Sequence, residues 1–585
     1  MATRKLAEAS APTSTQKCSP NGTASEEHGP VDTGAAAGLD VLLTDAAQGP
    51  LRRMLPGRAA VKTAAKLALK PDAVALRTLR LTTELAKIAA GRSDIEADKR
   101  DRRFKDQAWR ENPVFRRLLQ TYLATGRTVD GLICDADLDW ASERRVRFAA
   151  ENVLDALAPT NVPVTNPAAM KAALDTGGSN FTRGARNLVR DMSRPPRIPA
   201  MVDTSAFEVG RDLAVTPGAV VLRTPVLELI EYEPQTPKVR ERPLLLVPPM
   251  INKYYIADLA PGRSMLEHVV KDGQRAFAIS WRNPDERHAS WNLETYATSV
   301  LAALEAVESI TGSDATHVLG LCAGGIVLST VVAVLAARGE QDRIAGLTLG
   351  VCVLDNRRAG TAGAFMDPGT ATLATADSAR RGYLDGRSLA GVFAWLRPND
   401  LVWNYWVSNY LLGNPPPAFD ILYWNADTTN MSAGLHRDFV RVALENPLSH
   451  PGDLELLGTP IDLSQITVDT YLVAGISDHI TPWTSAYRSV RLLGSRPRFV
   501  LSTSGHIAAM VNPPGNEKAS FRVNDALPDD PDAWLRDATM TPGSWWQDWT
   551  AWLGERSGGE RDAPQDLGDT THRALGPAPG TYVRE

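Results

Sequence analysis

The chain has 585 residues, with 63 Lys and Arg against 68 Asp and Glu, so its formal net charge is −5. This near balance gives no sign of nucleic-acid binding over the whole chain. Because single hydrophobic cores stop growing at about 250–300 residues, the length predicts a catalytic domain together with a further domain.

The cysteines and the N-terminus bear on where the protein works. The four cysteines, at positions 18, 134, 322 and 352, show neither a pairing pattern nor a metal-ligand spacing. The N-terminus leads into Ser, Thr, Gly and Glu rather than an apolar signal core, and no stretch approaches the roughly 18–20 apolar residues of a membrane span. We therefore expect a reduced, cytoplasmic protein with no metal, bound cofactor or transmembrane segment.

The first 200 residues divide into two parts. Residues 1–38 are rich in Ala, Ser, Thr, Gly and Pro and lack a hydrophobic period, so we expect a disordered tail. Residues 39–200 are predicted to form a helical N-terminal domain that ends near the Pro-rich stretch 194–199. Its first helical run carries six basic residues before the first acid, Asp72: Arg52, Arg53, Arg58, Lys62, Lys66 and Lys70. Two interpretations stay open, a solvated helical face and an amphipathic surface-binding element.

Residues 201–585 alternate between strand-like and helix-like runs, beginning with a hairpin over 218–232. Such alternation predicts a mostly parallel sheet with helices on both faces. It stops between about 356 and 463, in a segment rich in aromatic residues and Pro that we expect to form a cap insertion. The near-helical spacing of five tryptophans close to the end favours core packing over stacking on a ligand: Trp534, Trp545, Trp546, Trp549 and Trp552.

Cys322 lies in the sequence Gly-Leu-Cys-Ala-Gly-Gly at 320–325, between a strand-like run and a helix-like run. Glycines beside a nucleophile allow the sharp strand-to-helix turn that lifts its side chain above the sheet. This pattern is a nucleophile elbow with sulfur in place of the usual oxygen. It predicts an α/β-hydrolase fold in which Cys322 is the nucleophile.

An acid and a histidine follow in the order that this fold requires. Asp478 lies just after the strand-like run 470–475, and His506 just after the next such run, 498–502. Both therefore fall at the edge of an open α/β sheet where sites form. Two rivals remain: Asp355 as the acid, although it is close to the elbow, and His479, which we interpret as a structural hydrogen-bonding histidine.

Several longer motifs resemble those of polyhydroxyalkanoate synthases, which polymerise 3-hydroxyacyl-CoA, and the resemblance extends over nearly the whole chain. The motifs are Asp-Arg-Arg-Phe at 101–104, Ala-Trp at 108–109, Ser-Ala-Phe-Glu-Val-Gly at 205–210, Pro-Pro-Met-Ile-Asn-Lys-Tyr-Tyr at 248–255, Ser-Trp-Arg-Asn-Pro at 280–284, the elbow, Asp-His-Ile-Thr-Pro-Trp at 478–483, Gly-His-Ile at 505–507 and Pro-Ala-Pro-Gly-Thr-Tyr-Val at 577–583. Segments 397–400 and 420–425 look most like the single-component, medium-chain subclass.

The resemblance implies the triad Cys322, Asp478 and His506, the same residues that the fold argument selects. It also implies (R)-3-hydroxyacyl-CoA as substrate, a homodimer, and attachment to polyester granules, with granule-associated proteins as further candidate partners. In such folds the backbone N–H groups of Ala323 and Ile251 are the expected oxyanion donors. No cofactor is implied, since CoA belongs to the substrate and is released as a product.

Two other functions compete with this expectation. One is a Cys-His-Asp hydrolase acting on esters or lactones, although such chains are about half this length and lack the helical domain and large cap. The other is an inactive granule-coating protein, against which the retention of all three groups argues.

Overall fold

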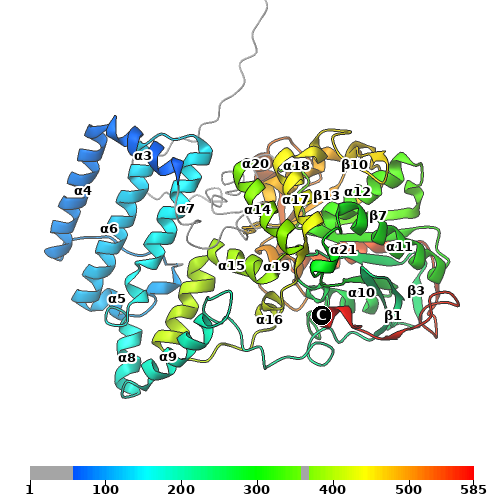
Figure 1. Cartoon of the computed structure of the whole chain (residues 1–585), viewed down its shortest axis with the longest axis horizontal. Coiled ribbons are helices and arrows are strands. Elements are labelled where there is room, and N and C mark those ends of the chain that lie inside the picture. Colours follow the sequence, from blue (N-terminus) through cyan, green and yellow to red (C-terminus); the bar gives the residue numbers. More distant parts are fainter. Residues whose placement is uncertain (1–56, 100, 357–367) are drawn as a thin grey trace, which may run out of the picture.

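The computed structural model describes residues 57–99, 101–356 and 368–585; the predicted tail, residues 1–38, lies outside this range. The first described part is helical and lies at one side of the molecule (Figure 1). Its helices are α3 (Arg58–Ala68), α4 (Pro71–Ala89), α5 (Ala108–Glu111), α6 (Pro113–Asp135), α7 (Trp140–Ala156), α8 (Pro167–Asp175) and α9 (Ser179–Met192).

Local sequence explains where these helices start. Pro71 is the first residue of α4, so the predicted helical run is two helices rather than one. The side chains of Asn112, Asp139 and Asn166 accept hydrogen bonds from the first turns of α6, α7 and α8. These caps satisfy backbone donors that a helix leaves unbonded.

The rest of the chain is built around one large mixed sheet, which confirms the predicted fold class. Its strand order is β15-β14-β13-β12-β7-β6-β4-β5-β2-β1-β17, and the central pairs from β13 to β5 are parallel. The strands are β1 (Gly218–Arg223), β2 (Leu227–Tyr232), β4 (Leu244–Val247), β5 (Ala276–Trp281), β6 (Thr316–Leu321), β7 (Ile344–Gly350), β12 (Thr470–Gly475), β13 (Arg498–Ser502), β14 (Ser520–Val523), β15 (Thr539–Pro542) and β17 (Gly576–Pro577). Short strands outside it are β3 (Lys238–Arg240), β8 (Tyr383–Leu384), β9 (Met431–Ser432), β10 (Glu455–Leu456), β11 (Thr459–Pro460) and β16 (Glu560–Asp562).

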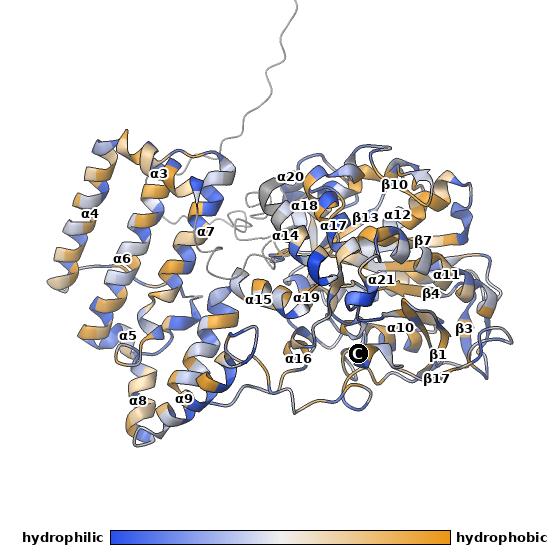
Figure 2. Cartoon of the chain, in the orientation of Figure 1, coloured by the Kyte–Doolittle hydropathy of each residue, from blue (hydrophilic) through white to orange (hydrophobic). Residues whose placement is uncertain are grey.

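Helices cover the sheet and bury an apolar core, visible as hydrophobic colour in β4 and α12 (Figure 2). They are α10 (Met265–Lys271), α11 (Leu293–Thr311), α12 (Ala323–Ala337), α18 (Trp483–Ser489), α19 (His506–Met510), α20 (Pro531–Asp537) and α21 (Trp545–Gly554). The C-terminal tryptophans are all buried, so their predicted role in core packing is confirmed.

The segment between β7 and β12 forms helices that lie beside the helical region (Figure 1). They are α14 (Pro368–Arg381), α15 (Gly386–Leu396), α16 (Asp420–Ala426) and α17 (Ala433–Glu445), with two π-helical turns, η7 (Asn399–Trp403) and η8 (Trp406–Leu411).

Helix α9 packs closely on η8. A Cβ added at Gly184 would lie 1.9 Å from the Tyr410 carbonyl oxygen, and Asn180 donates to the Leu411 carbonyl at 2.8 Å. The helical region is therefore joined to the cap segment, and the domain limits at 200, 356 and 463 stay predictions.

Candidate active site

Cys322 lies between β6 and α12 with a backbone φ of 49°, which is unusual for a residue with a side chain. Close packing explains the glycines around it. A Cβ at Gly320 would lie 2.6 Å from the Gly325 Cα, and one at Gly324 would lie 2.4 Å from the Val247 carbonyl oxygen. The structure therefore has the strained strand-to-helix turn that the sequence predicts.

Asp478 and His506 follow the adjacent parallel strands β12 and β13, and they meet as a buried pair. Asp478 Oδ2 lies 2.7 Å from His506 Nδ1. Its other oxygen, Oδ1, accepts the backbone N–H groups of Ile480 and Thr481, both at 2.8 Å. The Thr481 hydroxyl donates to Asp478 Oδ2 at 2.6 Å and lies 3.1 Å from His506 Nδ1. Sequence reasoning missed Thr481, although its place three residues after the acid was a usable signal.

The charges of this group support one another. Burial alone would raise the pKa of Asp478, but the charge and hydrogen bond of His506 and the donors of Thr481 hold this pKa below its ordinary value. Burial alone would lower the pKa of His506, but the charge of Asp478, and after it that of Cys322, raises this pKa above its ordinary value. Since Nδ1 bonds Asp478, Nε2 is the nitrogen of His506 that can take the proton of Cys322, which lines the same cavity.

A cavity of about 390 Å³ joins these residues to the cap. Cys322 and His506 line it together with Ile251, and most of its other walls are apolar. The cap contributes Leu401, Phe419, Ile421, Leu422 and Trp424. The arrangement places a thiol and an imidazole against a mostly apolar space, which suits acyl transfer with restricted access of water.

The loop after β4 carries Ile251, one of the two expected oxyanion donors. Asn252 has a φ of 68°, and its N–H donates at 2.7 Å to the hydroxyl of Thr429, which comes from the cap segment. The other expected donor, Ala323, is the first residue of α12, where backbone N–H groups have no partner within the helix. The donor role of both residues stays a prediction.

Lys253 fixes the same loop and was not singled out from the sequence. Its buried ammonium donates to the carbonyl oxygens of Val583 at 2.7 Å and Glu585 at 2.6 Å. Its own carbonyl accepts the indole N–H of Trp424 at 2.7 Å. One lysine thus ties the loop to the last residues of the sequence, while its backbone ties it to the cap.

The rival residues lie elsewhere or differ from expectation. Asp355 accepts a hydrogen bond from Asn446 at 3.0 Å, whereas His506 bonds Asp478. Burial raises the pKa of the Cys352 thiol, which disfavours the reactive thiolate form of this second buried cysteine. His479 lines the cavity, burial lowers its pKa to about 4, and its Nδ1 is buried with no partner in the described residues. The interpretation of His479 as a hydrogen-bonding histidine is therefore wrong for Nδ1.

The structure also bears on metal ligands, membrane spans and the basic run that begins at Arg52. Within residues 57–99, 101–356 and 368–585, no three His, Cys, Asp or Glu side chains are grouped to hold a metal, and no helix is long and apolar enough to cross a membrane. In the basic run, Lys62 pairs with Asp139 and Lys70 donates to the Asp135 carbonyl. Arg52 and Arg53 lie outside the described residues.

Two family models match the chain. "Poly-beta-hydroxybutyrate polymerase (PhaC) N-terminus" matches residues 100–269, and "alpha/beta hydrolase fold" matches residues 243–513. A solved monoacylglycerol lipase from Paleococcus ferrophilus overlaps 56% of this chain and 99% of its own, with a TM-score of 0.30 and 12% identity, which is too remote to inform function.

Curated relatives are much more similar. Poly(3-hydroxyalkanoate) polymerase 2 of Ectopseudomonas oleovorans is 46% identical over 86% of this chain and 90% of its own. The polymerase subunit PhaC of Cupriavidus necator is 44% identical over 85% of each chain, and the polymerase of Methylorubrum extorquens is 38% identical over 83% of this chain and 80% of its own. With this identity over most of its length, and an elbow cysteine beside a buried Asp-His pair, the chain belongs to the poly(3-hydroxyalkanoate) polymerase family.

Proposed function

We propose that this chain polymerises (R)-3-hydroxyacyl groups, taking them from CoA thioesters through an acyl group held on Cys322. The single observation that carries the proposal is that Cys322 and His506 line one cavity, with Asp478 bonded to His506, in a chain of this family. A thiol suits the task, because exchange of one thioester for another keeps the acyl group activated for the next attack.

In the acylation step, Cys322 Sγ attacks the thioester carbonyl while His506 Nε2 takes the thiol proton. The oxyanion that forms accepts hydrogen bonds from the N–H groups of Ala323 and Ile251. Collapse of this intermediate breaks the bond to the CoA sulfur, which leaves with the proton held by His506. Asp478 keeps the imidazole in the tautomer that can accept a proton at Nε2.

In the elongation step, a 3-hydroxyl oxygen attacks the carbonyl of the acyl group on Cys322, and His506 takes the hydroxyl proton. An ester bond forms, the bond to sulfur breaks, and the thiol of Cys322 recovers the proton. The apolar walls of the cavity favour this attack over that of water, since hydrolysis would end the chain. No cofactor is needed, because the thioester supplies the activation.

The test is incubation with C4 and C8 3-hydroxyacyl-CoA, followed by measurement of free CoA, free acid and polymer. We expect CoA release with polymer and little acid, and more polymer from C8 if the medium-chain resemblance holds. Cys322→Ala should abolish polymer and covalent labelling, Cys322→Ser should be nearly inactive, and Cys134→Ser should retain activity. Free acid in place of polymer would indicate a hydrolase, and labelling without Cys322 would contradict the assignment.

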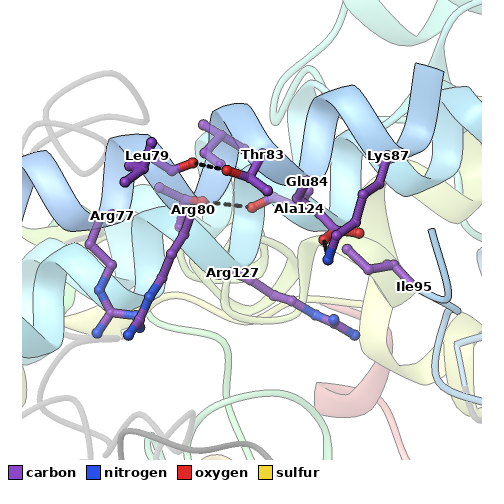
Figure 3. A pocket seen from close by; sticks show the side chains of 11 residues that line it. Arg77, Leu79, Arg80, Thr83, Glu84, Lys87, Ile95, Ala124 and Arg127 are labelled. Carbon is purple, nitrogen blue, oxygen red and sulfur yellow. Dashed lines mark hydrogen bonds and ion pairs between the residues drawn. The ribbon is translucent and has the colours of Figure 1, made fainter. Parts of the chain in front are cut away.

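We also propose that the enzyme works in the cytoplasm at the surface of its polyester, with α4 as a contact. Helix α4 exposes Leu76 and Leu79, and a cavity of about 490 Å³ beside it is lined by Arg77, Arg80, Lys87 and Arg127 (Figure 3). Apolar side chains with neighbouring cations suit an interface.

The contact predicts that the double variant Leu76→Glu/Leu79→Glu shifts active enzyme from the granule fraction to the supernatant, while Lys171→Glu on α8 does not. Equal granule recovery for both variants would show that the bound polymer alone holds the enzyme. The homodimer implied by the family is tested by sedimentation of the purified protein.

A further inference from the structure

The cavity at Cys322 is next to a larger one. A polar cavity of about 910 Å³ lies between the helical region and the cap, with walls from residues 101–109, 160–168 and 397–407. Arg397 and Asp400, which form an ion pair, line both cavities. A long ligand could therefore extend from Cys322, past this pair, into the polar cavity.

One arginine that lines this cavity bonds both of its sides. Arg103, from the helical region, bonds Asp101 and Asp155, both at 2.9 Å, and Asn399 of the cap at 3.1 Å. With the Tyr122 hydroxyl at 3.2 Å, four acceptors on four segments fix the guanidinium, whose five donors suit such a junction. The cavity thus depends on the helical region lying against the cap.

Two cations of the polar cavity carry no ion pair with the described residues. Asp101 and Asp155 share Arg103, and Asp400 pairs with Arg397. Arg102 and Lys105 are exposed and, in the part of the chain that the structure describes, have no acidic partner. Asp106 is the remaining acid on the wall. Arg102 and Lys105 are therefore the cations of this wall that can take up an anion without breaking an ion pair of the described residues.

The cavity also offers an aromatic wall. Trp403 and Tyr405 line it, and Trp403 belongs to an edge-to-face row with Trp395 and Trp406. The indole Nε1 of Trp403 is buried and has no hydrogen-bond partner among the described residues. A buried indole N–H normally has an acceptor, so this donor is unsatisfied behind the aromatic wall.

We propose that this polar cavity binds the phosphorylated nucleotide end of the acyl-CoA. Arg102, Lys105 and Arg397 contact its phosphates, Trp403 lies against the base, and the pantetheine arm runs past Asp400 to Cys322. The inference rests on the proposed function, because it takes a CoA thioester as the substrate. It assigns the helical region a share in substrate binding besides any role at a surface.

The test compares two substrates that share the acyl group. One is the 3-hydroxyacyl-CoA that the wild type uses, and the other is the matching N-acetylcysteamine thioester, which lacks the nucleotide. For the double variant Arg102→Gln/Lys105→Gln we expect the KM for the CoA thioester to rise on the order of tenfold. Its kcat should stay within about twofold, and kcat/KM for the short thioester should not change.

Exposed arginines of the helical region that line neither cavity give the matched control, Arg110→Gln/Arg186→Gln, for which both substrates should behave as with the wild type. Calorimetric binding of CoA to Cys322→Ala gives a second readout that needs no turnover. Adding the Arg102 and Lys105 substitutions should weaken the CoA Kd by a similar factor.

Two results would overturn the inference, and a third would refute the proposed function on which it rests. If the double variant lost kcat/KM equally with both thioesters, Arg102 and Lys105 would have only a structural role. An unchanged KM and an unchanged CoA Kd would place the nucleotide elsewhere while leaving the proposed function intact. A wild type that releases CoA without forming polymer would refute the polymerase function, and the comparison of Kd values would then judge the cavity alone.

Discussion

Replacing Asp478 by Asn should separate the acylation step from elongation. Because Oδ1 accepts two backbone N–H groups, from Ile480 and Thr481, the amide oxygen of an asparagine would take that position. Its NH₂ group would then face His506 Nδ1, which would have to accept rather than donate. The ring proton would move to Nε2, facing Cys322, and the imidazole could no longer take a proton there.

The size of the loss follows from the removed base. General-base assistance is worth about 10²–10⁴ in rate, so elongation, which needs a proton removed from an alcohol, should slow by roughly this factor. Acylation should fall much less, by about tenfold, because a thiol is far more acidic than an alcohol and depends less on the base.

Rapid mixing with 3-hydroxyacyl-CoA measures both steps, since the first CoA released per Cys322 reports acylation and the later steady release reports elongation. We expect Asp478→Asn to keep the initial burst and lose the steady phase. Thr481→Val removes one hydroxyl at 2.6 Å from the carboxylate but keeps its charge, so the steady phase should fall only about tenfold. Asp355→Asn should keep both phases. A steady phase that survives in Asp478→Asn but not in Asp355→Asn would refute the assignment of the acid.

Three further predictions concern the framework of the site. Lys253→Met removes the donor to the carbonyl of Val583, a buried residue, and to that of Glu585, an exposed one, so the free energy of unfolding should fall by about 2 kcal/mol. The kcat should fall more than KM changes, with partial recovery in Lys253→Arg, and an unchanged kcat would deny the positioning role. Gly324→Ala places a Cβ 2.4 Å from the Val247 carbonyl oxygen, and chemical denaturation should show that the free energy of unfolding falls by about 1–3 kcal/mol. Gly262→Ala is the control: its Cβ meets open space, so the free energy of unfolding should fall only by what a positive φ costs alanine. Burial raises the pKa of Asp258 from 3.8 to about 6, so the folded state binds the proton more tightly and stability should fall by about 2 kcal/mol as pH rises from 4 to 6. Chemical denaturation at several pH values should show this decrease in the wild type and not in Asp258→Asn, and equal slopes would contradict the reasoning.

Short-range patterns were enough to predict the fold and the order of the candidate triad. Cys322, Asp478 and His506 each directly follow a parallel strand, and the carboxyl ends of parallel strands meet at one edge of the sheet. Glycines at 320 and 324 indicated the turn, because close packing there leaves no room for a Cβ. Both His479 and His506 lie near that edge, and the sequence favoured His506 because His479 adjoins Asp478 and would have to turn away from it to reach Cys322.

Tertiary structure alone decided which distant residues complete the site. Thr429 lies 177 residues from Asn252, Val583 lies 330 residues from Lys253, and Asn399 lies 296 residues from Arg103. Periodicity and strand-end position describe a chain only over one element and its loop, whereas these hydrogen bonds depend on how the cap, the helical region and the last residues pack on the sheet. Elbow and triad order were therefore readable in the sequence, because local backbone geometry sets them. The loop anchors and the second cavity were not, because they exist only where separate segments meet.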